Sequence, residues 1–194
     1  MYPARRYAVP SSIALVYDFV NSRDARHFLR DGVRNVEQDS LATPHELQDW
    51  LVDHRLLAPG SKVSTALHQD AITIRESLRA FLCRGTADRR APSPEMTALE
   101  KVMRKFPLVV GWNDQRELAL RSRSSDAYGA MAAVVAGVYS AAMSGELDRL
   151  KSCPAAECQW VFFDRTKPNT GKWCDSAICG NREKKRAYRR RKKT

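Results

Sequence analysis

The feature that most constrains how this chain folds is a group of four cysteines near its C-terminus. They stand at Cys153, Cys158, Cys174 and Cys179, as two Cys-x4-Cys pairs separated by fifteen residues. A disulfide framework would need an oxidising compartment, and the N-terminal segment shows no secretion signal. A redox centre usually uses a Cys-x-x-Cys pair, which the sequence lacks. The spacing therefore favours one structural Zn²⁺ held by four thiolates, with no coordination position left open for catalysis.

The positive charge of the chain lies in the same region. The chain has 33 Lys and Arg against 22 Asp and Glu, a net charge of +11. Residues 1–150 hold 20 basic and 18 acidic side chains, a net of +2, whereas residues 151–194 hold 13 basic and 4 acidic ones, a net of +9. This asymmetry indicates a C-terminal segment that binds a polyanion, although a solvated basic tail without a partner has the same composition.

The aromatic residues of the C-terminal segment allow two interpretations. Trp160, Trp173 and Tyr188 could stack on bases, which would make the segment an RNA-binding zinc module. We favour the other interpretation, in which Trp160, Phe162 and Trp173 form a small core. A module of about forty residues has too little core to fold without a metal, which again favours zinc.

The first 150 residues are expected to be mainly helical. Apolar periodicity and capping signals, among them the capping box Thr43-Pro44-His45-Glu46, predict helices and one β-hairpin. We expect helices near residues 12–22, 44–57, 61–84, 93–106 and 124–143, and the hairpin within 107–121. The predicted organisation is a helical domain over 1–150 and a zinc finger over 151–194, with a hairpin and a basic helix that starts near Gly180.

Several functional classes are disfavoured. All four histidines (His27, His45, His54 and His68) lie outside the cysteine module, so a finger nuclease would lack its usual general base. We therefore expect no enzyme. No apolar run approaches the roughly 18 residues of a membrane span, which predicts a soluble, cytoplasmic protein. Cys83 is expected to be a small buried hydrophobe. The small residues of 127–142 could serve either internal packing or a homodimer.

The cysteine module resembles the CGNR zinc finger of bacterial proteins. The resemblance rests on Cys153-x4-Cys158-Gln-Trp-Val-Phe-Phe-Asp164-Arg-Thr166 and on Trp173-Cys174-x4-Cys179-Gly180-Asn181-Arg182. The upstream region resembles the ABATE domain that usually accompanies this finger. The matching segments there are Asp18-Phe19-Val20-Asn21-Ser22, Glu46-Leu47-x-x-Trp50-Leu51 and Ile74-Arg75-Glu76-x-Leu78-Arg79.

The resemblance implies a bacterial, stress-induced transcription regulator whose treble-clef-like finger binds double-stranded DNA. The four cysteines correspond to the zinc ligands, and Arg182 is our first choice for a phosphate or guanine contact. Lys185 is a second candidate for base edges, with phosphate contacts from Arg186, Arg189, Arg190 and Lys193. One departure from the family is Gly171-Lys172, where two Arg are common.

The resemblance also implies that the ABATE domain senses a small ligand. Asp18, Asn21, Trp50, Arg75 and Glu76 could converge on a pocket in which Arg75 meets an anion. The alternative is that the Asp and Asn cap a helix and that Arg75 belongs to a buried ion pair.

Overall fold

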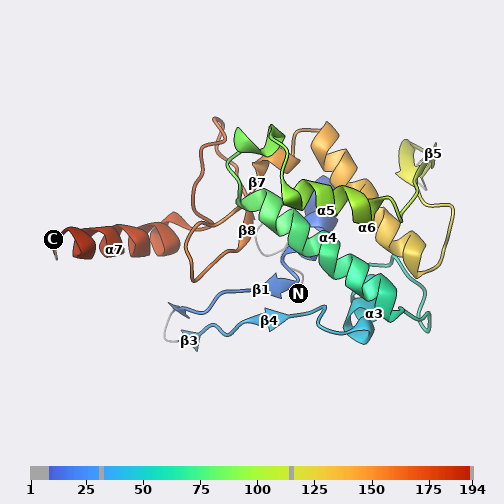
Figure 1. Ribbon diagram of the computed structural model, residues 1–194, viewed down its shortest axis with the longest axis horizontal. Helices are drawn as coiled ribbons and strands as arrows, with labels where there is room; N and C mark the ends of the chain where they lie inside the picture. The colour runs from blue at the N-terminus through green and yellow to red at the C-terminus, as the bar shows by residue number, and fades with distance from the viewer. Residues whose placement is uncertain (1–8, 31–32, 114–115, 193–194) are drawn as a thin grey trace.

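The computed structural model describes residues 9–30, 33–113 and 116–192. A helical body carries the C-terminal cysteine module at one end, and the last helix projects away from it (Figure 1). This confirms the predicted class, a mainly helical N-terminal part followed by a hairpin and a basic helix. In the described residues, no helix is long and apolar enough to span a membrane. The helices of the body are η1 (Ser11–Ile13), α2 (Ala14–Val20), α3 (Pro44–Asp53), α4 (Thr65–Cys83), η2 (Asp88–Arg90), α5 (Pro94–Met103), α6 (Ala127–Met143) and η3 (Leu147–Arg149).

Side-chain caps decide where the longer helices begin. Thr43 accepts a hydrogen bond from the Glu46 N–H at 3.2 Å, as the capping box predicts. The predicted start of the long helix at residue 61 was wrong, because Ser64 captures the Leu67 N–H and α4 begins at Thr65. Similarly, Asp126 caps α6, which begins three residues later than predicted.

The small-residue helix α6 lies at the centre of the body. It contacts η1, α2, α3 and α4, and ten of its seventeen residues are buried. Because Ala and Gly let neighbouring helices approach closely, the buried residues of α6 serve internal packing, and a homodimer through this helix stays a prediction. The predicted burial of Cys83 was also wrong: this residue is exposed at the end of α4, off the apolar stripe that contains Leu78 and Leu82.

Every strand pair among the described residues is short and antiparallel. The predicted hairpin is present as β5 (Val109–Trp112) and β6 (Leu118–Arg121). Between α2 and α3 the chain forms two further pairs that were not predicted, because two-residue strands are too short to show a periodicity. These are β1 (Arg23–Asp24) with β4 (Gln38–Asp39), and β2 (Leu29–Arg30) with β3 (Val33–Arg34).

The cysteine module packs directly on the body. Its hairpin pairs β7 (Leu150–Ser152) with β8 (Val161–Phe163), so the strands flank the first cysteine pair. Trp160 is buried in the same hydrophobic cluster as α2 and α4, and its Nε1 donates to the Tyr17 hydroxyl at 2.9 Å. Phe162 and Trp173 are partly buried at the edge of this cluster. The expected separate core of the finger is therefore part of the core of the body.

Polar side chains of the body also bind the backbone of the module. The Asn21 amide donates to the Val161 carbonyl at 2.9 Å and accepts from the Val161 N–H at 3.0 Å. Arg79 donates to the carbonyl of Gln159, and Arg89 donates to that of Leu150. Because these groups are buried, each bond must form for the module to dock without leaving an unsatisfied polar atom.

This docking predicts the effect of substituting Asn21. Asn21→Ala leaves the N–H and the carbonyl of Val161 without partners in a buried position, which should lower the free energy of unfolding by about 2–4 kcal/mol. Denaturant unfolding followed by far-ultraviolet circular dichroism measures the change. Gln69→Ala, which removes an exposed amide from α4, is the control and should change stability little. A loss for Asn21→Ala no larger than for the control would contradict the docking role.

Candidate metal centre and nucleic-acid interface

Four separate pieces of backbone bring the cysteines together. Cys153 follows β7, and its N–H donates to the Trp160 carbonyl at 2.9 Å. Cys158 closes a tight turn, with its N–H on the Ala155 carbonyl at 2.8 Å. Cys174 ends the long loop that follows β8, and Cys179 lies in the π-helical turn η4 (Ser176–Gly180). The four Sγ atoms all lie within 4.8 Å of one another.

The spacing of the sulfurs matches a tetrahedral zinc site. A Zn–S bond of about 2.3 Å places tetrahedral sulfurs about 3.8 Å apart. The Sγ of Cys174 lies 3.5 Å from that of Cys158 and 3.6 Å from that of Cys179. Three of the four cysteines are buried, and four thiolates complete the coordination of the ion. Cys153, Cys158, Cys174 and Cys179 therefore form a structural Zn²⁺ site, as predicted.

The ionisation of the thiols shows why a cation belongs here. Hydrogen bonds from the thiols of Cys158 and Cys174 lower the pKa of Cys153. A hydrogen bond to Cys153 raises the pKa of Cys158. A separate hydrogen bond to Cys153 raises the pKa of Cys174. Desolvation raises the pKa of Cys179. Burial and mutual repulsion thus disfavour four thiolates at such close range, and a divalent ion provides the attraction that they need.

A buried carboxylate organises the loop between β8 and Cys174. Asp164 accepts hydrogen bonds from Lys151 Nζ at 2.6 Å, from the Thr166 N–H at 2.9 Å and from the Gly171 N–H at 2.6 Å. Desolvation raises the pKa of Asp164, but these bonds outweigh it and hold the pKa at about 2. A Cβ at Gly171 would lie 2.6 Å from the carboxylate, so this position requires glycine here. The departure from the family at Gly171 thus coincides with a close approach of Asp164.

The second cysteine pair leads straight into the basic helix α7 (Asn181–Arg191). The helix begins one residue after the predicted start, but η4 precedes it. Asp175 caps that turn by accepting the N–H groups of Ala177 and Ile178, so these donors are not directed at the thiolates. A Cβ on Gly180 would lie 3.2 Å from the Trp173 ring, which explains the glycine at this junction. The hairpin-and-helix layout is observed, and its assignment as a treble clef stays a prediction.

The helix α7 carries seven Lys and Arg among eleven residues and points away from the body (Figure 1). In the described residues, η4 is the one element with which it makes extensive contact. Lys185, Arg189 and Arg190 are exposed, as a role in binding requires. Lys193, the last predicted contact, lies outside the described residues.

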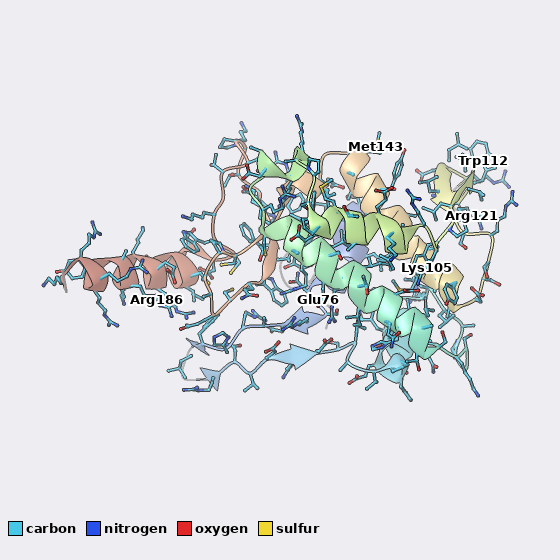
Figure 2. All side chains as sticks on the ribbon, in the orientation of Figure 1. Glu76, Lys105, Trp112, Arg121, Met143 and Arg186 are labelled. Atoms are coloured by element: carbon cyan, nitrogen blue, oxygen red, sulfur yellow. The ribbon has the colours of Figure 1, made fainter. Side chains whose placement is uncertain are left out.

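Arg182 and Arg186 are instead held by the turn between the first two cysteines. Each guanidinium pairs with a different carboxylate oxygen of Glu157, and Arg182 also lies 4.1 Å from the centroid of the Phe28 ring. Arg186 pairs in addition with Glu183 at 2.8 Å. These contacts anchor the first two turns of α7 (Arg186 in Figure 2). Sequence reasoning missed Glu157, although an acid inside a cysteine turn of a strongly basic module is a detectable signal.

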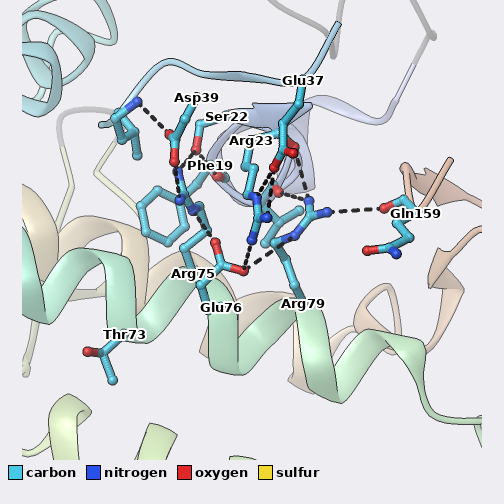
Figure 3. Close-up of polar contacts among 12 residues, drawn as sticks. Phe19, Ser22, Arg23, Glu37, Asp39, Thr73, Arg75, Glu76, Arg79 and Gln159 are labelled. Atoms are coloured by element: carbon cyan, nitrogen blue, oxygen red, sulfur yellow. Dashed lines mark hydrogen bonds and ion pairs between the residues drawn. The ribbon is translucent and has the colours of Figure 1, made fainter. Parts of the chain in front are cut away.

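Two of the candidate ligand-binding residues belong to a network between α4 and the β1–β4 pair (Figure 3). The buried Arg75 donates to both carboxylate oxygens of Asp39, at 2.6 and 2.7 Å, and to Ser22 Oγ at 3.1 Å. Its Nε donates to Glu76 at 2.8 Å. Arg75 is thus engaged in the buried ion pair that the sequence left open as the alternative to an anion site.

The other three candidates lie in two different places. Asp18 is buried, with a carboxylate oxygen 3.5 Å from His54 Nε2, and the Trp50 ring stacks on His54 at 3.9 Å. Asn21 binds the backbone of Val161. The structure therefore distributes the five residues over three groups of contacts, and ligand binding by them stays a prediction.

Comparison with protein families adds two matches. Residues 14–146, more than half of the chain, match the model of ABATE, a family described as "Putative stress-induced transcription regulator". Residues 149–192 match the model of the CGNR zinc finger. Neither description names an enzyme. A comparison with curated proteins finds no match for the chain.

The metal site predicts that replacing a zinc ligand and replacing Cys83 have different effects on zinc content and stability. Elemental analysis of the reduced protein should find one zinc ion per chain. Cys174→Ala should abolish this stoichiometry and lower the free energy of unfolding by about 3 kcal/mol or more, because metal binding and folding of the module are coupled. Cys83→Ala, outside the cluster, should keep both the zinc and the stability. One zinc per chain in the Cys174→Ala protein would refute the site.

The Arg75–Asp39 pair predicts a dependence of stability on pH. Desolvation raises the pKa of Asp39, but hydrogen bonds from Arg75 and the Leu41 N–H outweigh it, so the pKa is lowered. A lowered pKa contributes stability above the ordinary value of about 3.9, and this contribution is lost as the pH falls below it. Asp39→Asn should therefore cost about 2 kcal/mol at pH 7.

Urea unfolding of the wild type and of Asp39→Asn between pH 7 and pH 3 tests the direction of this pH dependence. The difference in unfolding free energy should narrow below about pH 4, since the wild-type carboxylate then becomes protonated. A difference that stays constant or widens toward acid would contradict the assignment.

Proposed function

Because the chain belongs to the ABATE family and ends in a CGNR zinc finger, we propose that it is a transcription regulator that binds double-stranded DNA through α7. The observation that carries the proposal is a cationic helix with one end anchored. The zinc site and Glu157 hold its first turns, while most of its Lys and Arg side chains are exposed. Anchored cations suit a polyphosphate, because neutralising phosphates releases counterions and binding is then favoured by entropy.

The dimensions of α7 suit the major groove of DNA. Its eleven residues span about 16 Å, and the groove is wide enough to admit one α-helix. The one acid within α7 is Glu183, and Glu157 approaches the helix from the turn between the first two cysteines. Both pair with Arg186. Residues 187–191, the projecting half of the helix, therefore carry three arginines and no acidic residue that would repel phosphates.

The contacts of α7 separate its cations into two groups. Arg182 and Arg186 face the cysteine turn, where Glu157 neutralises part of their charge. Lys185 and Arg189 are exposed and four residues apart, so they share one face of the helix. We therefore assign DNA contact mainly to the face with Lys185 and Arg189, and positioning of the helix mainly to Arg182 and Arg186.

The aromatic residues favour duplex DNA over unpaired RNA. Stacking on bases needs exposed rings, but Trp160 is buried against Tyr17 and has Arg26 over its ring at 4.1 Å. Tyr188 is exposed, with Lys192 Nζ 5.0 Å from its ring centroid. One exposed ring on a cationic helix is a small platform compared with the several that single-strand binders use. The proposal places the protein in the cytoplasm, where thiols stay reduced and can hold zinc.

The proposal predicts a loss of DNA affinity on removing two exposed cations. Lys185→Ala with Arg189→Ala should weaken binding to a duplex at least about tenfold at 0.1 M salt, because two phosphate contacts are lost. The slope of log affinity against log salt should become shallower by about 2. Fluorescence anisotropy with a labelled duplex measures both quantities.

The matched control removes two exposed cations from the body, with Lys62→Ala and Lys101→Ala. This variant has the same net charge as the first, so equal losses in both would show a nonspecific effect of charge and refute a role for α7. Competition with single-stranded RNA provides the second test. RNA that displaces the duplex at equal concentration would favour the RNA-binding alternative.

A further inference from the structure

The β5–β6 hairpin presents its large apolar side chains to solvent. The register pairs Val110 with Leu120 and Trp112 with Leu118, so these four residues lie on one face of the hairpin. Val110, Trp112 and Leu118 are 72%, 61% and 67% exposed. We call this surface the hairpin face. Trp112 lies at the opposite end of the molecule from Arg186 (Figure 2).

The other face of the hairpin carries smaller groups and lies nearer the body. Val109, Gly111 and Ala119 are half-buried there, and Arg121 donates to the Trp112 carbonyl on the neighbouring strand. This is the reverse of an ordinary surface hairpin, whose apolar face covers the core. A two-stranded hairpin is marginally stable in water, so leaving its apolar face exposed is costly.

We propose that a second copy of this chain covers the hairpin face, so that the protein forms a symmetric dimer through β5 and β6. In a twofold arrangement the same side chains meet, and two such faces can stack as two sheets do, with Trp112 near the centre of the contact. Two exposed residues of opposite charge, Arg116 and Glu117, also stand side by side just before β6. A twofold axis can place Arg116 of each copy opposite Glu117 of the other copy.

The distribution of charge favours this end of the molecule for self-association. Residues 151–194 carry a net charge of +9, so two copies that met near α7 would repel each other strongly. The hairpin face lies on the near-neutral body, and its use leaves both basic helices free.

The area of the hairpin face sets the strength of the dimer. Its exposed aromatic and aliphatic groups amount to about 400 Å² per copy, or about 800 Å² for the pair. This is below the size of a permanent interface, so we expect association that depends on concentration in the micromolar range.

Sedimentation velocity of the zinc-loaded full chain from 1 to 200 µM tests the proposal. The wild type should shift from monomer to dimer over this range. Trp112→Thr with Leu118→Thr should weaken the dimer more than about tenfold, because Trp at the centre of an interface often dominates its affinity. Threonine keeps the β-propensity of both strands, and Leu118→Arg alone provides a second disruptive variant.

The control removes two equally exposed apolar residues between α2 and α3, with Leu29→Thr in β2 and Val36→Thr after β3. This control should dimerise like the wild type. The double variant Lys185→Ala with Arg189→Ala should also dimerise like the wild type, so a failure of the dimer proposal can be distinguished from a failure of the proposed DNA binding. A wild type that stays monomeric at 200 µM overturns the proposal. An equal loss of dimer affinity in the control with Leu29→Thr and Val36→Thr also overturns it. Binding of the monomer to phosphatidylcholine–phosphatidylglycerol vesicles, lost in Leu118→Arg, would overturn it in favour of a lipid surface.

Discussion

The zinc-bridged cluster of four sulfurs is the interaction on which the C-terminal half of the molecule depends. It ties the turn after β7 to the π-helical turn before α7, two segments far apart in the sequence. Without this tie, a helix with seven cations among eleven residues would repel itself and fray. The ion therefore converts a locally unfavourable sequence into a helix with a defined direction.

The second requirement is that the module itself be held on the body. Trp160 enters the common core, and Asn21, Arg79 and Arg89 bind backbone groups of the module. Buried polar bonds of this kind add little net stability, but an unmade bond is costly, and they therefore select one docking geometry.

The four acidic residues of the module have structural tasks. Glu157 and Glu183 pair with arginines of α7, Asp164 organises the loop before Cys174, and Asp175 caps the helical turn. Glu157, Glu183 and Asp164 pair with cations close to the zinc site, whereas the projecting end of α7 contains no acidic residue. The charge of the module is thus sorted along its length, with arginines anchored by Glu157 near the metal and exposed cations farther out.

The sequence by itself determined the metal ligands, the helical class, the β5–β6 hairpin and the concentration of charge, because each depends on local spacing or composition. It also placed the cap at Thr43. Tertiary structure decided the rest: that Trp160 belongs to the core of the body, that Asp39 is the partner of Arg75, and that Cys83 is exposed. It likewise divided the arginines of α7 between Glu157 and solvent. These outcomes depend on contacts between residues far apart in the chain, and neither spacing nor periodicity contains information on which distant groups share one buried environment.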